Sequence, residues 1–259
     1  RPITPDDIPG FVREEVPELT DTILNGGSDG PDEAGGPGAG SGSQTEAQDD
    51  LPPFRLELPP IPDDGIERTV LTAENDEQLH ELFAAGNLSN TEIHLTGGTY
   101  HGEHLVTDEM GNTYTLENLA ISQYENLSLI GDGTTRLIVG HEDALIISAY
   151  ECDNLLLYGL VLGHDVLPDV PCTAPVLSLS YCTNTRIVGC DIFGCGLIGL
   201  NGFETTLTMQ DSAIRDCSEN AVRWSGSGDA TFENCFFAGN GATLFYIYDG
   251  GASFTLTDC

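Results

Sequence analysis

The sequence predicts an all-β solenoid, in which short strands stack coil upon coil around a shared interior. Six segments of similar pattern begin at Asn126, Asn154, Asn184, Thr206, Asp229 and Ser253. Their starts are 28, 30, 22, 23 and 24 residues apart, a period typical of solenoids. Apolar residues alternate within each segment, which indicates strands with one inward side and not helices. Gly-rich and Asn/Asp-rich corners separate the strands.

Alignment of the segments places like residues above one another in inward columns. The first column is Leu127, Leu155, Thr185, Leu207, Ala230 and Phe254. The second is Leu129, Leu157, Ile187, Met209, Phe232 and Leu256, and the third contains Leu162, Ile192, Ile214 and Phe237. Strands stacked in this way pair in parallel and in register, about 4.8 Å apart. We also expect Asn126, Asn154 and Asn184 to stack at a corner, where Asn tolerates the left-handed conformation.

A second set of strands is predicted between the segments, from five short β-rich runs. These runs occupy residues 144–148, 176–180, 197–200, 221–224 and 243–248. Before the repeats, Thr72 is the expected N-cap of an amphipathic helix over 73–85, with Leu79, Leu82 and Phe83 on one face. A strand and turn should follow at 91–100. The helix would cover the open first coil, the edge that solenoids must protect.

The chain divides by composition into three parts. Residues 1–25 are acidic but rich in apolar side chains, which suits a docking peptide in an extended N-terminal tail. Residues 26–65 have the Gly, Ser, Pro and acidic content of a linker, stiffened by proline toward its end. Residues 66–259 form the predicted solenoid domain.

The charge of the chain limits its partners. There are 42 acidic side chains against eight Lys and Arg, for a net charge of −34. A field this negative disfavours binding to nucleic acid and to anionic membranes, because both require positive charge on the protein. We also expect no membrane insertion, since no apolar run approaches the roughly 18 residues of a membrane span.

Several features favour an extracellular or cell-surface location. The sequence begins at Arg1 without Met, as a mature exported product would. Asn87 and Asn126 each stand in an Asn-Leu-Ser sequon for N-glycosylation.

Seven of the eight cysteines of the chain fall into columns of the repeat. Cys152 and Cys182 share one column, Cys195 and Cys217 a second, and Cys235 and Cys259 a third with Cys190, interrupted by Ser212. Neighbours in a stack lie within the Cα range of a disulfide, but parallel side chains do not automatically reach the required dihedral angle. The sequence is therefore compatible both with disulfide bonds and with stacked reduced thiols. No spacing typical of a metal site appears, and no metal is expected.

These elements resemble a known superfamily. A helix, then IHLTGGTY, then NLSLIGDGTTRLIV, then repeated coils look like the pectate-lyase-like superfamily of single-stranded right-handed parallel β-helices. Residues 159–200, GLVLGHDVLPDVPCTAPVLSLSYCTNTRIVGCDIFGCGLIGL, are similar to bacterial secreted proteins described only as right-handed β-helix region proteins. The resemblance covers roughly 66–259 and implies the fold, whereas such folds host lyases, hydrolases, adhesins and structural proteins.

One hypothesis is a carbohydrate-active enzyme, either a polysaccharide lyase or a glycoside hydrolase. Lyases of this superfamily that act on uronates use Ca²⁺ held by acidic residues together with an Arg or Lys base, and Lys is absent from this chain. The best available constellation is Asp191 and Arg215, diagonal on neighbouring coils, with His164 and Asp165 one coil earlier. An ordinary surface ion pair explains the same residues, so no catalytic residue, Ca²⁺ site or other cofactor is predicted.

The hypothesis we favour is a secreted structural or adhesive protein, not an enzyme, that self-assembles head to tail into a filament. Cys259 falls in the middle of a repeat unit, so we expect an open last coil. The predicted interface joins that coil to the N-terminal segment of another copy. It comprises Ile8, Phe11, Val12, Val16, Leu19, Ile23 and Leu24 with Phe254 and Leu256. Glycans are a further expected partner, although a pure glycan-binding module would show a row of outward aromatic residues, and only Tyr158 and Phe193 are clear candidates.

Overall fold

The computed structural model describes residues 58–102, 104–107, 113–116, 118–141, 143–165, 173–194 and 197–259, without the side chains of 104–107 and 113–116. The chain divides into two units, Arg1–Pro52 and Pro53–Cys259, and all described residues belong to the second. The predicted docking peptide, residues 1–25, therefore lies outside the described residues together with its seven apolar interface residues. The same holds for the linker as far as residue 57.

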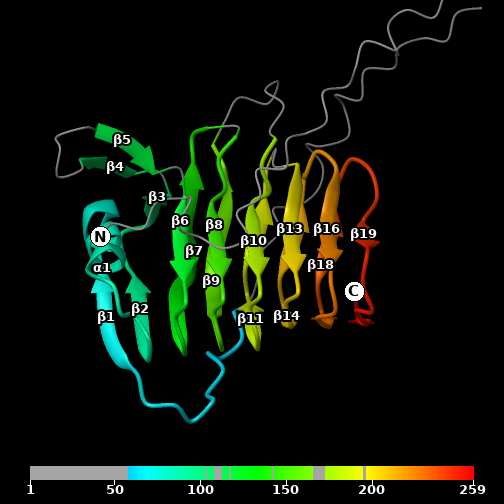
Figure 1. Cartoon of the computed structure of the whole chain (residues 1–259), viewed down its shortest axis with the longest axis horizontal. Coiled ribbons are helices and arrows are strands. Elements are labelled where there is room, and N and C mark those ends of the chain that lie inside the picture. Colours follow the sequence, from blue (N-terminus) through cyan, green and yellow to red (C-terminus); the bar gives the residue numbers. More distant parts are fainter. Residues whose placement is uncertain are drawn as a thin grey trace, which may run out of the picture. The chain divides into compact units, whose positions relative to one another are not determined.

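The second unit is a parallel β-helix (Figure 1). Its larger sheet has twelve strands, and eight of them follow one another along the stack. These are β1 (Thr69–Ala73), β2 (Thr91–Leu95), β7 (Leu127–Val139), β9 (Leu156–His164), β11 (Thr185–Val188), β14 (Leu207–Gln210), β17 (Ala230–Glu233) and β20 (Phe254–Thr257). Beside them lie β3 (Thr99–His101), β12 (Asp191–Phe193), β15 (Ala213–Arg215) and β18 (Phe236–Ala238).

A second sheet of six strands runs along the stack as well. Its strands are β6 (Leu119–Ser122), β8 (Ile147–Tyr150), β10 (Leu177–Ser180), β13 (Ile198–Phe203), β16 (Asn220–Ser225) and β19 (Phe245–Tyr248). They correspond to the five predicted β-rich runs plus β6, which was not predicted. A small antiparallel pair, β4 (His104–Thr107) and β5 (Thr113–Leu116), completes the described strands.

The register confirms all three predicted inward columns. In the second column, for example, Leu129 pairs with Leu157, Leu157 with Ile187, and Met209 with Phe232. In the third, Leu162 pairs with Ile192 and Ile192 with Ile214. Most of these side chains are completely buried and belong to one continuous core. Period-two alternation was sufficient for this prediction because a slip of one residue would turn every apolar side chain outward.

Two details at the start of the domain differ from the prediction. Helix α1 spans Asp76–Ala85, and its N-cap is Asn75, whose side chain accepts a hydrogen bond from the Gln78 backbone N–H. Thr72 is not the cap, because it lies in β1, where it pairs with His94 of β2. The unpredicted strand β1 therefore precedes the helix. Leu79 is fully buried as expected.

The predicted asparagine corner is present. Asn126, Asn154 and Asn184 have φ values of 57°, 55° and 52°, in the left-handed region. The Asn154 amide donates to Oδ1 of Asn126 over 2.8 Å, and the Asn126 amide donates to Asn90 Oδ1 over 2.8 Å. The Asn184 amide leaves this ladder and donates to Oδ1 of Asp153 over 3.0 Å. Each corner therefore aligns one coil with the coil before it.

Residues 58–68, which we call the strap, lie against the outer side of β7, β9 and β11. Outward-facing Ile130, Leu156, Tyr158 and Val188 form a small apolar cluster, and Leu58 packs against it. The Tyr158 hydroxyl donates a hydrogen bond to the Pro59 carbonyl oxygen.

At the far end of the strap, Asp64 joins three coils by polar contacts. Its carboxylate accepts hydrogen bonds from Arg68 at 2.6 and 2.8 Å, from Arg186 at 2.8 Å and from Asn154 at 3.1 Å. Because Arg68 also donates to the Asn126 carbonyl oxygen at 2.9 Å, this end of the strap is tied to the asparagine corner.

Candidate functional site

Asp191 and Arg215 meet on the outer side of β12 and β15, on neighbouring coils, with Arg215 two residues beyond Ala213, the partner of Asp191. The guanidinium donates from Nε and from Nη2 to the two carboxylate oxygens of Asp191, each over 2.9 Å, and from Nη1 to Asp216 over 2.7 Å. It also lies 4.8 Å from the ring centre of Phe193. Both Asp191 oxygens are thus engaged by a cation. The pair therefore offers neither a free base nor a nucleophile in this arrangement.

His164 does not join this pair. It follows inward Leu162 by two residues on β9, so its side chain points into the interior, and it is 5% exposed. Nε2 donates to the Ala144 carbonyl oxygen over 2.7 Å, and burial lowers the pKa of the imidazole. Asp165 is exposed at the end of the strand. The four candidate residues consequently form one ion pair, one interior histidine and one exposed carboxylate, not a single site.

The described cysteines are free thiols. Cys152 and Cys182 are buried one coil apart, each preceding the paired residues Asp153 and Thr183. Burial raises the pKa of Cys190, Cys217 and Cys235 to about 12. These three thiols are therefore protonated at neutral pH and pack as small apolar groups. Cys259 is exposed, whereas Cys195 lies outside the described residues.

The two sequons differ in accessibility. Asn87 is exposed with φ 56°, in the loop after α1. The amide of Asn126 is engaged on both sides, as a donor to Asn90 and an acceptor from Asn154. A glycan on Asn126 would replace one of its two amide hydrogens and place a sugar at a corner where this amide already bonds to both neighbouring coils.

On expression in a glycosylating host, we therefore expect a glycan at Asn87 and none at Asn126. Peptide mass spectrometry after enzymatic deglycosylation checks this, with Asn87→Gln as the variant that should remove all N-linked sugar. Glycan found on Asn126 of the folded protein would contradict the structural reason given.

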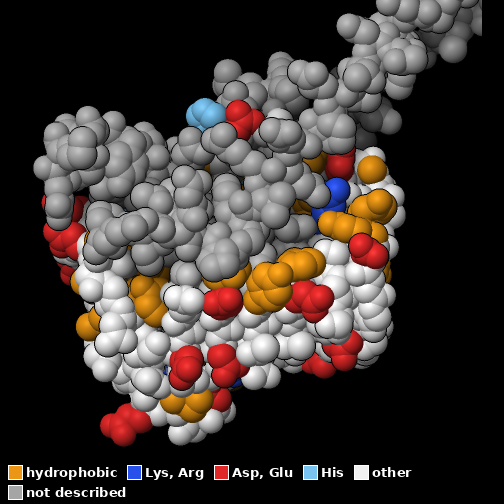
Figure 2. All heavy atoms as spheres, in the orientation of Figure 1, with side chains coloured by type: hydrophobic (Ala, Val, Ile, Leu, Met, Phe, Trp, Pro, Cys, Tyr) orange, Lys and Arg blue, Asp and Glu red, His pale blue; other side chains and the backbone are white. Residues whose placement is uncertain are grey.

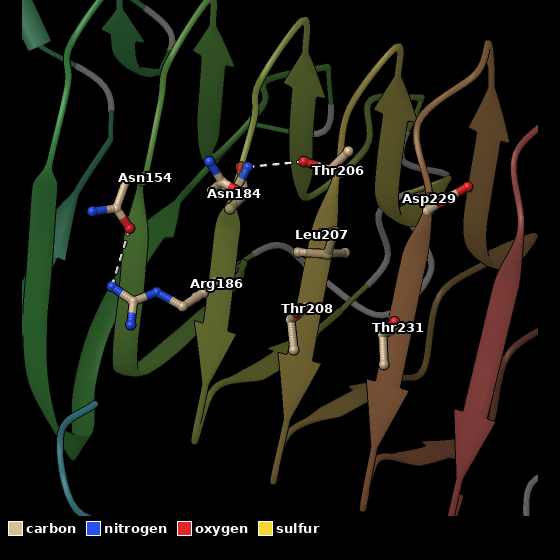
Figure 3. A pocket seen from close by; sticks show the side chains of 9 residues that line it. Asn154, Asn184, Arg186, Thr206, Leu207, Thr208, Asp229 and Thr231 are labelled. Carbon is tan, nitrogen blue, oxygen red and sulfur yellow. Dashed lines mark hydrogen bonds between the residues drawn. The ribbon is translucent and has the colours of Figure 1, made fainter. Parts of the chain in front are cut away.

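A polar pocket of about 350 Å³ opens on the outer side of the larger sheet, beside the strap (Figure 3). It is lined by Asn154, Asn184, Thr185, Arg186, Thr206, Leu207, Thr208, Asp229 and Thr231. Thr208 and Thr231 occupy equivalent positions on neighbouring strands. The alignment of the repeated segments in the sequence already places these two threonines in one column. Arg186 donates to Asp64 and, over 3.2 Å, to Asn154, so its charge is balanced within the protein. The pocket offers hydroxyl, amide and carboxylate groups to a polar ligand, and Oδ1 of its carboxylate, Asp229, accepts a hydrogen bond from the Ser253 backbone N–H over 2.9 Å.

Acidic side chains lie between hydrophobic patches on the face displayed in Figure 2. Among the described residues, no group of three or more His, Cys, Asp or Glu is placed to hold a metal ion. In the same part of the chain, no helix is long and apolar enough to cross a membrane.

Comparisons with known proteins match a family model and solved structures. A family model described as a right handed beta helix region matches residues 146–259. The full-length tailspike protein 2 from Escherichia coli O157:H7 bacteriophage CAB120 aligns at 14% identity with a TM-score of 0.28, over 65% of this chain and 28% of that chain. The enzymatically active domain of bacteriophage CBA120 tailspike protein 2 aligns at 14% identity with a TM-score of 0.25, over 72% of this chain and 33% of that chain.

This chain therefore spans a third or less of either tailspike chain. A comparison with curated proteins gives no match.

Proposed function

We propose that this right-handed parallel β-helix is a secreted structural or adhesive protein whose copies join head to tail into a filament. The observation that carries the proposal is the exposed apolar face of the coil formed by β18, β19 and β20. In Figure 1 this coil lies at the opposite end of the stack from β1.

This face consists of inward-pointing residues that no described coil covers. Leu256 pairs with Phe232, and Ile247 pairs with Trp224. Phe232 and Trp224 are completely buried, but Leu256 and Ile247 are each 47% exposed. The same columns that form the core elsewhere are therefore half exposed here, on the last described strands of both sheets. Such a surface suits an added strand or apolar segment.

The occupant we propose is the apolar segment 1–25 of a neighbouring copy. At the other end of the stack, Leu79 of α1 belongs to the core, and Leu82 and Phe83 pack against it. These contacts support the proposal that α1 covers the first coil. In this proposal α1 covers one end of the stack and the other end receives the neighbouring copy. A head-to-tail contact of this kind gives an open filament where successive rotations do not close into a ring.

Assembly should depend on both sides of the proposed contact. We expect the full chain to sediment as concentration-dependent oligomers, and a chain lacking residues 1–25 to sediment as a monomer. Leu256→Asp and Ile247→Asp should also give monomers, because a carboxylate at the contact must be desolvated. Ile61→Asp, at a residue 41% exposed on the strap, is the matched control and should assemble normally.

Sedimentation velocity over a hundredfold range of concentration measures this effect, with circular dichroism to confirm that each variant is folded. A full chain that stays monomeric throughout this range would exclude the filament. Assembly that survives the deletion of residues 1–25 would exclude that segment as the occupant.

No observation on the described residues favours the carbohydrate-active enzyme. Such an enzyme needs a carboxylate or base free to react, and a uronate lyase would also use Ca²⁺. Asp191 is held by Arg215, and His164 points inward. We therefore propose the structural or adhesive role in preference to the enzymatic one.

A further inference from the structure

The outer side of the six-stranded sheet carries a row of aromatic side chains. The rings of Tyr150 and Tyr181 are 5.8 Å apart, and those of Tyr181 and Phe203 are 5.1 Å apart, both edge to face. Two coils further along, Tyr246 and Tyr248 have ring centres 5.4 Å apart.

Arg223 completes this surface, which we call the aromatic face. It lies on β16, between the two groups of rings, and its guanidinium is 5.8 Å from the Tyr246 ring and 5.6 Å from the Tyr248 ring. The strands concerned follow in the order β8, β10, β13, β16 and β19. Four spacings of about 4.8 Å give the face a length of about 19 Å.

The expectation that outward aromatic residues are few was therefore wrong. Tyr158 does face outward, but the strap covers it, and it is 6% exposed. The exposed rings lie on the other sheet, and Tyr181, Tyr246 and Tyr248 are 46%, 46% and 41% exposed.

Tyr181 occupies a position where an aromatic residue is unusual. It directly follows β10 at a corner, with φ 55°. The equivalent corner residues of the other coils, also at positive φ, are Gln123, Glu151, Glu204, Gly226 and Asp249. A bulky side chain is uncommon in this conformation, which small or polar residues adopt more easily. The chain thus keeps a large, half-exposed ring at a site unfavourable for it, and such outliers suggest function.

Polar groups run alongside the rings. Ser148, Ser178 and Asn201 lie two residues before the ends of their strands, on the same outer side, and pair in register. The Asn201 amide donates to Ser178 Oγ over 3.3 Å. The acidic corner residues Glu151 and Glu204 follow the strands on either side of β10. The face therefore combines apolar rings with hydroxyl, amide and carboxylate groups along one line.

This combination matches the chemistry of a sugar chain. A pyranose ring has apolar C–H faces that pack on aromatic rings and hydroxyl groups that need hydrogen-bond donors and acceptors. A polyanionic glycan is disfavoured, because Glu151 and Glu204 border the face and the whole chain carries a net charge of −34. Arg223 supplies N–H donors that hydroxyl groups can accept.

We propose that the aromatic face binds a neutral glycan chain, laid along the stacking direction of the coils. This inference does not depend on the filament. Its centre, Tyr181 and Phe203, lies on β10, β13 and their corners, whereas the proposed assembly contact lies on the last described coil.

The test is affinity electrophoresis and titration calorimetry of the full chain with three probes: a soluble mixed-linkage glucan, a galactomannan and polygalacturonate. At least one neutral polysaccharide should bind, equally well at low and high salt, and polygalacturonate should not. Tyr181→Ala should weaken binding at least tenfold, and Tyr181→Phe should retain it. Phe236→Ala, at a ring 41% exposed on the other sheet, is the matched control and should bind as the parent does.

Tyr181→Gln is a second variant, to be used if the alanine variant does not fold. Glutamine suits this corner because Gln123 occupies the equivalent position. Failure of both neutral polysaccharides to bind would overturn the proposal. Equal binding by the parent and the Tyr181 variants, or salt-sensitive binding of polygalacturonate alone, would overturn it as well. A variant that assembles but does not bind the polysaccharide would show a failure of glycan binding alone. A variant that binds the polysaccharide but does not assemble would show a failure of the filament alone.

Discussion

Replacing Trp224 with alanine is expected to lower the free energy of unfolding by about 3–5 kcal/mol, the range for deleting a buried aromatic side chain. Trp224 is completely buried. Its indole N–H donates to the Gly228 carbonyl oxygen over 2.8 Å, and its ring packs edge to face on Phe254 at 5.7 Å. The alanine variant leaves a cavity between two coils and an unsatisfied carbonyl group. Urea denaturation followed by circular dichroism measures the loss.

The packing around Trp224 can also be tested from Gly202, which lies on the neighbouring coil. Gly202 pairs with Trp224, and a Cβ atom on Gly202 would lie 2.2 Å from the indole ring. Gly202→Ala should therefore destabilise the protein by about 1–3 kcal/mol through overpacking. In combination with Trp224→Leu, this penalty should shrink, because the ring that causes the clash is gone. Strictly additive effects, or a loss below about 1 kcal/mol for Trp224→Ala, would contradict this account of the packing.

Replacing Asp64 with asparagine is expected to release the strap. The carboxylate joins Arg68, Arg186 and Asn154, and hydrogen bonds to a charged group contribute about 1.5–3 kcal/mol each to stability. Asparagine keeps the shape but loses the charge, so we expect a loss of about 1–3 kcal/mol at pH 7. Hydrogen exchange should show faster exchange in residues 58–68. Asp63→Asn, at an exposed neighbour, is the control and should leave this exchange unchanged.

The same variant predicts how stability depends on pH. The hydrogen bond from Arg68 is the largest cause that holds the pKa of Asp64 well below its usual value of 3.8. A carboxyl group whose pKa is lowered on folding stabilises the protein above the unfolded value, and this contribution is lost as the pH falls below it. The stability difference between the parent and Asp64→Asn should therefore be constant near neutral pH and narrow below about pH 3.8. A difference that widened in acid would show that the charge of Asp64 is not what holds the strap.

The repeat made most of the fold predictable. Columns such as Leu129, Leu157 and Ile187 were assigned correctly because an inward position must be apolar in every coil. The left-handed corner at Asn154 followed from the conformational tolerance of asparagine. The assignment of Thr72 was wrong because the sequence around it is compatible with a short strand and with the start of a helix. Pairing with β2 makes this segment a strand.

The candidate sites were harder to predict, because they combine residues from different coils at outward positions. Asp191 and Arg215 were placed together correctly, since adjacent aligned segments contain them. His164 was not, because the sequence does not show that its strand continues inward past Leu162. The aromatic face was missed because Tyr181 is a corner residue, where alternation no longer tells which way a side chain points.

Periodicity and alternation in the chain were enough to establish the stacked coils and the inward columns. They suffice because burial acts on every coil in the same way, so the requirement is repeated along the chain. Which outward groups meet was decided only in the folded molecule: the strap covers Tyr158, and the corner of β10 sets Tyr181 between two other rings. Outward positions are under no common burial constraint, and their neighbours are set by strand register and corner geometry together.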